Sequence, residues 1–87
     1  MDKIKDLRNQ IDMLDDELMK LLSKRYDISE QIGEIKSNSK KEVLDLKRED
    51  YVLNKAKKHN HSQQLELVYK TIMSESKNVQ RRKINSQ

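Results

Sequence analysis

An apolar stripe near the N-terminus is the feature that most constrains the fold. With one interruption, Leu or Ile recurs every three or four residues from Ile4 to Ile35, a spacing that places side chains on one face of an α-helix. A helix from about Lys3 to about Lys36 is roughly 50 Å long at 1.5 Å per residue. A compact chain of 87 residues has a radius of gyration near ~12 Å and is about 30 Å across. The rest of the chain therefore cannot cover this helix, and we predict that a second copy covers it in a homodimer.

The composition favours helices and excludes a sheet. Proline is absent, Gly33 is the only glycine, 39% of residues are charged and 33% are hydrophobic, with neither Phe nor Trp. Such a chain forms long helices with solvated faces and cannot fill a broad globular core. We predict one all-α domain over residues 1–87, with one long, one short and one medium helix per chain, intertwined in the homodimer.

A short second helix follows a polar connection. Residues 37–41 are rich in turn and cap formers and show no apolar periodicity, which is typical of a loop. The second helix is predicted to begin near Asp45, whose carboxylate can cap it, and to end around Lys58. Its inner side is expected to carry Leu46, Leu53 and Ala56.

A second polar segment at residues 59–62 precedes the third helix. Ser62 can serve as its N-cap, and the helix is predicted from about Gln63 to about Arg82. Heptad spacing there is shown by Leu65, Val68, Ile72, Glu75 and Val79, and the charged Glu75 interrupts this otherwise apolar seam. Ser76 and Gln80 lie along one edge of this seam, one turn apart.

Several classes of protein and site are excluded by what the sequence lacks. The chain has no cysteine, so it holds neither disulfides nor thiolate sites. The N-terminal MDKIKDLRNQ lacks the apolar run of a signal peptide, and no stretch approaches the roughly 20 apolar residues of a membrane span. We therefore expect a soluble cytoplasmic protein with no membrane contact. His59 and His61 lack the further ligands of a metal site, and no glycine-rich phosphate loop or matched nucleophile and base is present.

Arg25 interrupts the apolar stripe. A guanidinium at a buried helix position stays charged, so it must meet an anion or reach water. Lys36 lies eleven residues later, within about 20° of the same direction and roughly 16 Å away, so both cations can approach one small dianion. Arg8 lies about 25 Å from Arg25 along the helix and points roughly 100° away. Arg8 and Arg25 can grip one small molecule only if they come from different chains of an antiparallel dimer.

Each of these residues also has a simpler explanation when it is taken alone. Arg25 is explained as a charge that fixes the pairing register of a helical dimer. Arg8 and Lys36 suit a solvated helix face, and Asp45 suits a helix cap. Gly33 costs about 1 kcal/mol in a helix interior, which either close helix packing or the approach of a ligand would justify.

The sequence resembles a known family over about residues 4–53. The stretch LRNQIDMLDDELMKLLSKRYDISEQIGEIK, followed after a short loop by VLDLKRED, is similar to the pattern of the all-helical, type II chorismate mutases. The last helix matches that family through Ser76, Gln80 and its apolar spacing. The link between the second and third helices is short for this family, and the first loop lacks the proline often found there.

The resemblance implies a role for eight residues. Arg25, together with Arg8 of the other subunit, would bind the two carboxylates of chorismate, and Lys36 and Gln80 would donate hydrogen bonds to the ether oxygen whose bond breaks. Glu49, with the backbone near Asp45, would hold the ring hydroxyl, and the polar lining is completed by Arg48 and Ser76. The resulting activity, conversion of chorismate to prephenate in the biosynthesis of Phe and Tyr, would need no cofactor and no metal.

Three other functions remain open at this point. An isochorismate pyruvate lyase of the same fold would use a related pericyclic step. A non-catalytic helical dimerisation module would use Arg25 for register alone. Nucleic-acid binding would rest on a short basic cluster formed by Lys77, Arg81, Arg82 and Lys83, but the chain has few aromatic residues for base stacking, so we expect no nucleic-acid partner.

Overall fold

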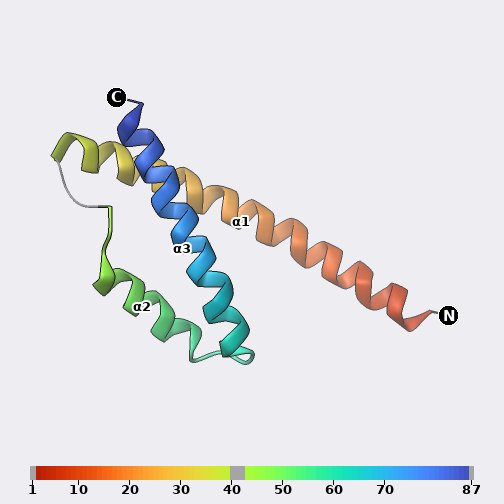
Figure 1. The fold of residues 1–87 in the computed structure, drawn as a ribbon. Coiled ribbons are helices and arrows are strands. Elements are labelled where there is room, and N and C mark those ends of the chain that lie inside the picture. The colour runs from red at the N-terminus through yellow and green to blue at the C-terminus, as the bar shows by residue number, and fades with distance from the viewer. Residues whose placement is uncertain (1, 40–42, 87) are drawn as a thin grey trace.

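Three α-helices make up the part of the chain that the structure, a computed structural model, describes: residues 2–39 and 43–86. They are α1 (Lys3–Ser39), α2 (Leu46–Ala56) and α3 (Ser62–Asn85), shown in Figure 1. This result confirms the predicted all-α class and the order of a long, a short and a medium helix. Within the described ranges, none of the helices combines the length and apolar character needed to cross a membrane.

The first connection ends with a capped start of α2, as predicted. The Asp45 carboxylate accepts a hydrogen bond from the Arg48 backbone N–H at 3.0 Å, which satisfies one of the open donors at the helix start. Helix α1 continues to Ser39, three residues beyond the predicted end. The predicted loop positions Lys40 and Lys41 lie outside the described residues.

The start of α3 differs from the prediction. His61, not Ser62, is the N-cap residue, and it makes no capping hydrogen bond through its side chain. His61 has φ 60°, in the left-handed region, because the chain reverses direction within the few residues that separate α2 from α3. Ser62 is the first residue of the helix, which runs to Asn85.

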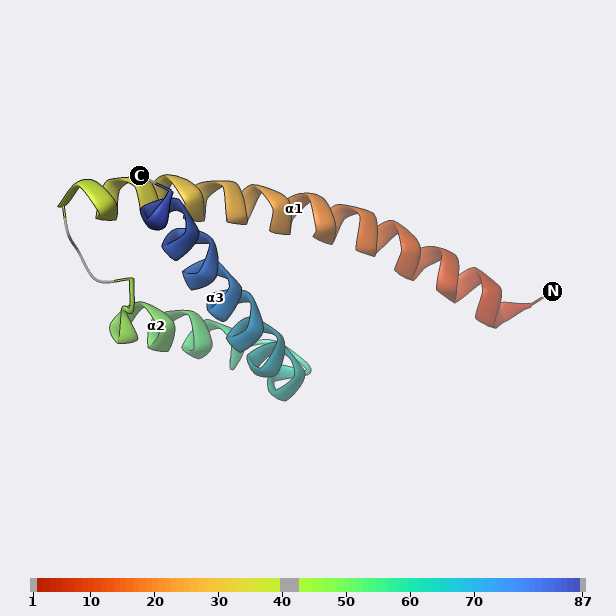
Figure 2. The ribbon, with the colours of Figure 1, turned by 45° about the horizontal axis from the view of Figure 1, so that its top comes forward.

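Helix α3 joins the other two. It contacts both α1 and α2, and the two views show it crossing the C-terminal half of α1 on one side and lying against α2 on the other (Figures 1 and 2). The small core consists of Val52, Ala56, Ile72 and Met73. The prediction for α2 was correct for Ala56 and wrong for Leu46, which is exposed. Leu46 lies about 120° around the helix from Val52, so it points away from the narrow contact with α3.

The N-terminal half of α1 projects away from the rest of the molecule (Figure 2). The chain extends 58 × 26 × 13 Å and has a radius of gyration of 16.4 Å, well above the ~12 Å of a compact chain of this length. Its apolar stripe is open to solvent: Leu14 is 68% exposed and Leu21 is 60% exposed. As predicted from the length of the helix, one chain does not cover its own seam.

Candidate active site

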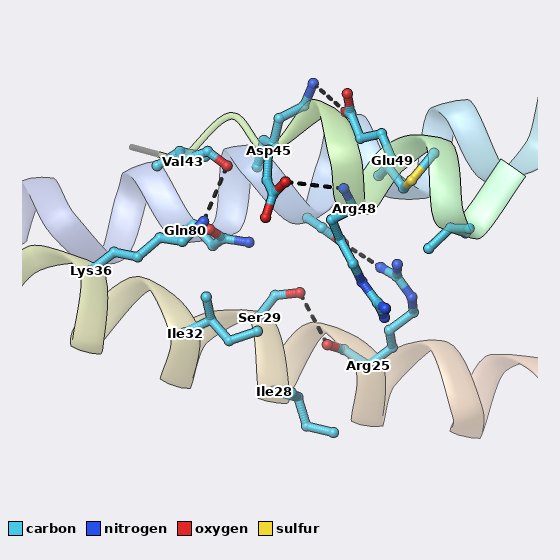
Figure 3. A pocket seen from close by; sticks show the side chains of 14 residues that line it. Arg25, Ile28, Ser29, Ile32, Lys36, Val43, Asp45, Arg48, Glu49 and Gln80 are labelled. Carbon is cyan, nitrogen blue, oxygen red and sulfur yellow. Dashed lines mark hydrogen bonds and ion pairs between the residues drawn. The ribbon is translucent and has the colours of Figure 1, made fainter. Parts of the chain in front are cut away.

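A cavity of about 460 Å³ lies where the three helices meet. Figure 3 shows α1 along one side of it and the start of α2 along the other. Its lining comes from all three helices and the segment before α2: Arg25, Ile28, Ser29, Ile32, Lys36, Val43, Asp45, Arg48, Glu49, Val52, Met73, Ser76, Lys77 and Gln80. The volume is within the range of cavities that bind small molecules.

Helix α1 contributes residues from a single face. Arg25, Ser29, Ile32 and Lys36 all line the cavity, and their spacing of three and four residues keeps them on one side of the helix. The prediction that Arg25 and Lys36 share a direction is therefore confirmed. The Lys36 ammonium donates a hydrogen bond to the backbone carbonyl of Val43 at 3.2 Å, which ties the end of α1 to the segment before α2.

Arg25 turns toward α3 and is half-buried. Its Nη1 donates a hydrogen bond to the Ser76 hydroxyl, and the Ser29 hydroxyl donates to the Arg25 carbonyl at 3.1 Å. A guanidinium has five N–H donors, and the Ser76 hydroxyl carries no charge, so the positive charge of Arg25 is left to attract an anion. Arg25 also borders a neighbouring cavity of about 420 Å³, which Arg48 lines as well.

Ser76 and Gln80 are buried on α3, with 7% and 8% of their surface exposed. The Gln80 side-chain oxygen is buried without a hydrogen-bond partner among the described residues. A buried polar atom without a partner costs about 1–3 kcal/mol, and such atoms in native structures mark places that a ligand or water completes. Figure 3 places Gln80 beside Lys36, toward the opposite end of the cavity from Arg25.

Gly33 allows α1 and α3 to approach each other at Gln80. A Cβ atom built on Gly33 would lie 2.8 Å from the Gln80 Cα and 2.9 Å from the Gln80 carbonyl oxygen, closer than real Cβ contacts. The sequence left open whether this glycine serves helix packing or ligand approach. The structure assigns it to packing, and that packing sets the position of Gln80.

Three charged residues at the start of α2 line the cavity. Asp45 caps the helix, and the Glu49 carboxylate pairs with the Lys77 ammonium of α3 at 2.9 Å. The Arg48 guanidinium lies over the ring of Tyr51, 5.2 Å from its centroid, within the range of a cation–π contact. Arg48 and Glu49 therefore present opposite charges to one cavity.

The structure brings together seven of the eight residues singled out in the sequence: Arg25, Lys36, Asp45, Arg48, Glu49, Ser76 and Gln80. Arg8 is exposed on the projecting half of α1 and lies outside this cavity. Its assignment to a partner's site stays a prediction.

Sequence reasoning missed part of the lining. Ser29 is one helical turn after Arg25, so the same spacing that paired Arg25 with Lys36 could have found it. Lys77 was grouped with the basic residues at the end of the chain, whereas the structure pairs it with Glu49. Only the packing of α3 against α2 reveals that pair. Within residues 2–39 and 43–86, no group of three or more His, Cys, Asp or Glu side chains could hold a metal ion.

Comparisons with known proteins agree with the resemblance noted in the sequence. A family model described as chorismate mutase type II matches residues 7–81. The chain is 36% identical, over 55 residues, to the bifunctional chorismate mutase/prephenate dehydratase of Aquifex aeolicus (strain VF5). That alignment covers 63% of this chain and 15% of the relative, so the chain spans only a small part of the relative's length. No solved structure gives a significant match.

Proposed function

The chain belongs to the chorismate mutase type II family, and we propose that it converts chorismate to prephenate in the biosynthesis of Phe and Tyr. The observation that carries the proposal is the convergence of three cations, Arg25, Lys36 and Arg48, with the buried amide of Gln80 around one cavity. Such a charge pattern suits a small dianion.

The chemistry of this reaction matches what the cavity offers. In the rearrangement a C–O bond breaks while a C–C bond forms within the same molecule, with no proton abstraction and no covalent intermediate. The enzyme must hold the folded conformer of the substrate and stabilise the negative charge that grows on the ether oxygen. Fixed cations and amide donors are sufficient for both tasks, and no cofactor is needed.

The two ends of the cavity receive different parts of the substrate in this proposal. Arg25 binds a carboxylate, with Arg48 and Ser76 completing the polar lining on that side. Lys36 and Gln80, which lie together in Figure 3, donate hydrogen bonds to the ether oxygen. Glu49 accepts the hydrogen bond of the ring hydroxyl, with the backbone near Asp45 beside it.

We propose that a second copy of the chain completes each site. Arg8 and Arg25 are about 25 Å apart along α1, so one chain cannot place both on one small molecule. The exposed Leu and Ile side chains on the same helix supply the apolar surface that a homodimer would bury. In that dimer, Arg8 of one subunit binds the second carboxylate in the site of the other.

We expect the protein to carry out this reaction in the cytoplasm.

The test is turnover by the purified chain. Chorismate and isochorismate are supplied separately, and loss of each substrate is followed by absorbance. We expect turnover of chorismate only. Turnover of isochorismate alone would assign a pyruvate lyase, and turnover of neither would favour a non-catalytic dimerisation module.

Variants of the two donors make this test specific. Loss of one preorganised donor typically lowers kcat about 10²–10³-fold, so we expect Lys36→Met and Gln80→Ala to fall in this range. Lys20→Met, an exposed change on α1 that removes the same charge as Lys36→Met, is the matched control and should keep full activity. Equal activity of all three variants would contradict the assignment of the site.

A further inference from the structure

We propose that Lys77 is a positioning residue that holds the Glu49 carboxylate as the acceptor for the ring hydroxyl of the substrate. The inference rests on the proposed function and adds a residue that neither the sequence motif nor the resemblance assigned to the site. It starts from one contact: the Lys77 Nζ lies 2.9 Å from the Glu49 Oε1.

This ion pair differs from an ordinary surface pair in distance and burial. The Lys77 and Glu49 side chains are 24% and 23% exposed, whereas Lys20 and Glu17 form a 4.0 Å pair that is largely exposed. Exposed pairs contribute little because water and salt screen them, and partly buried pairs are screened much less. The contact at Glu49 can therefore hold a flexible side chain in one orientation.

The charge balance of the cavity explains why Glu49 needs a cation. The charged lining consists of four cations (Arg25, Lys36, Arg48 and Lys77) and two carboxylates (Asp45 and Glu49). Asp45 already accepts from the start of α2. A dianionic substrate would repel the ionised Glu49 at close range, and Lys77 offsets that repulsion where it arises.

The geometry leaves Glu49 able to act as an acceptor. A carboxylate has two oxygens with about four sites for hydrogen bonds, and Lys77 occupies Oε1. The pair joins α2 to α3 at the cavity, and Lys77 directly follows Ser76 on the helix that also carries Gln80. Helix α3 thus carries both Gln80, the proposed donor to the ether oxygen, and Lys77, which orients Glu49 as the acceptor for the hydroxyl.

The test compares chorismate with an analogue in which hydrogen replaces the ring hydroxyl. The hydroxyl takes no part in the bond changes, so the analogue can still rearrange. The measured quantity is the ratio of kcat/KM for chorismate to kcat/KM for the analogue. A general loss of positive charge lowers kcat/KM for both substrates, so its effect cancels in this ratio. Loss of an oriented acceptor for the hydroxyl lowers kcat/KM for chorismate alone.

We expect Lys77→Met to lower this ratio about 10-fold, the size of effect typical for a lost hydrogen bond to a charged group. Lys77→Arg should keep the ratio within about twofold, because its guanidinium can also bind a carboxylate. Lys70→Met, an exposed change on α3 that removes the same charge, should leave kcat/KM for both substrates unchanged.

A second variant tests whether Lys77 acts through Glu49. Glu49→Gln should also lower the ratio, and adding Lys77→Met to it should lower the ratio no further. An unchanged ratio in a folded Lys77→Met protein would overturn the inference while leaving the proposed function intact. A wild-type chain that turns over neither substrate would instead overturn the proposed function.

Discussion

Replacing Gly33 with alanine tests whether the close approach of α1 and α3 positions the two proposed donors, Lys36 and Gln80. The added Cβ would lie 2.8 Å from the Gln80 Cα, 2.9 Å from its carbonyl oxygen and 3.3 Å from its carbonyl carbon. These are backbone atoms, so no side-chain rotation can relieve the clash. Because ordinary contact begins near 3.4 Å, the two helices must separate by about 0.6 Å at this point.

The expected effect is large on catalysis and small on stability. Overpacking costs about 1–3 kcal/mol, and the gain in helix propensity on replacing glycine with alanine returns about 1 kcal/mol of it. A misplacement of about 1 Å in an active site costs about 10²-fold in rate, so a shift of about 0.6 Å at Gln80 should lower kcat roughly 10- to 100-fold. Gln80 moves with α3 while Lys36 stays with α1, so the two donors no longer converge.

The assay measures kcat and KM from the loss of chorismate, beside thermal unfolding followed by circular dichroism. Gln31→Ala, an exposed change two residues earlier on α1, is the control and should match the wild type in both measurements. A folded Gly33→Ala protein with kcat within twofold of the wild type would refute the reasoning. If kcat fell equally in Gln31→Ala, the fall in Gly33→Ala could not be attributed to the contact between α1 and α3.

Three further predictions concern the proposed homodimer and the cap on α2. Arg25→Leu should abolish turnover and leave the dimer intact by sedimentation, because an apolar residue replaces a costly charge. Removing the charge should also stabilise the dimer, but the Ser76 hydroxyl then loses its hydrogen-bond donor. The full gain in stability should therefore appear only when Arg25→Leu is combined with Ser76→Ala. Residual turnover in Arg25→Leu would disprove the role assigned to Arg25. Refolding an equal mixture of the Arg8→Leu protein and the Arg25→Leu protein should restore up to about one quarter of wild-type activity. Half of the dimers formed at random contain one chain of each variant, and each of these mixed dimers has one intact site out of two. No recovery in a mixture shown to contain mixed dimers would place Arg8 outside the partner's site. Asp45→Ala should destabilise the chain by about 1 kcal/mol through loss of the cap on α2, measured by urea unfolding; an unchanged midpoint would show that the cap contributes nothing.

Local periodicity was enough to predict most of the fold. The repeat of Leu and Ile from Ile4 to Ile35 predicted α1, and its length relative to the chain predicted a seam that one copy cannot cover. The short-range capping chemistry of Asp45 predicted the start of α2. These features depend on residues a few positions apart, so helix geometry alone relates them.

The same geometry directly predicted two of the seven site residues that the structure brings together. Arg25 and Lys36 share one face of one helix, and this followed from their spacing of eleven residues. The resemblance to a family then added the residues on α2 and α3. Arg8 remains a prediction, because its place depends on a second chain.

Only the tertiary structure decided which side chains of different helices meet. Ser76 and Gln80 flank the apolar seam of α3 in the sequence, yet they are buried because α3 crosses α1 on that side. The pairing of Lys77 with Glu49 and the left-handed turn at His61 likewise had no local signal. The physical reason is that contacts between helices depend on their crossing and separation. Here the close approach that Gly33 permits brings α3 against α1 at Gln80, and no spacing along the sequence encodes that approach.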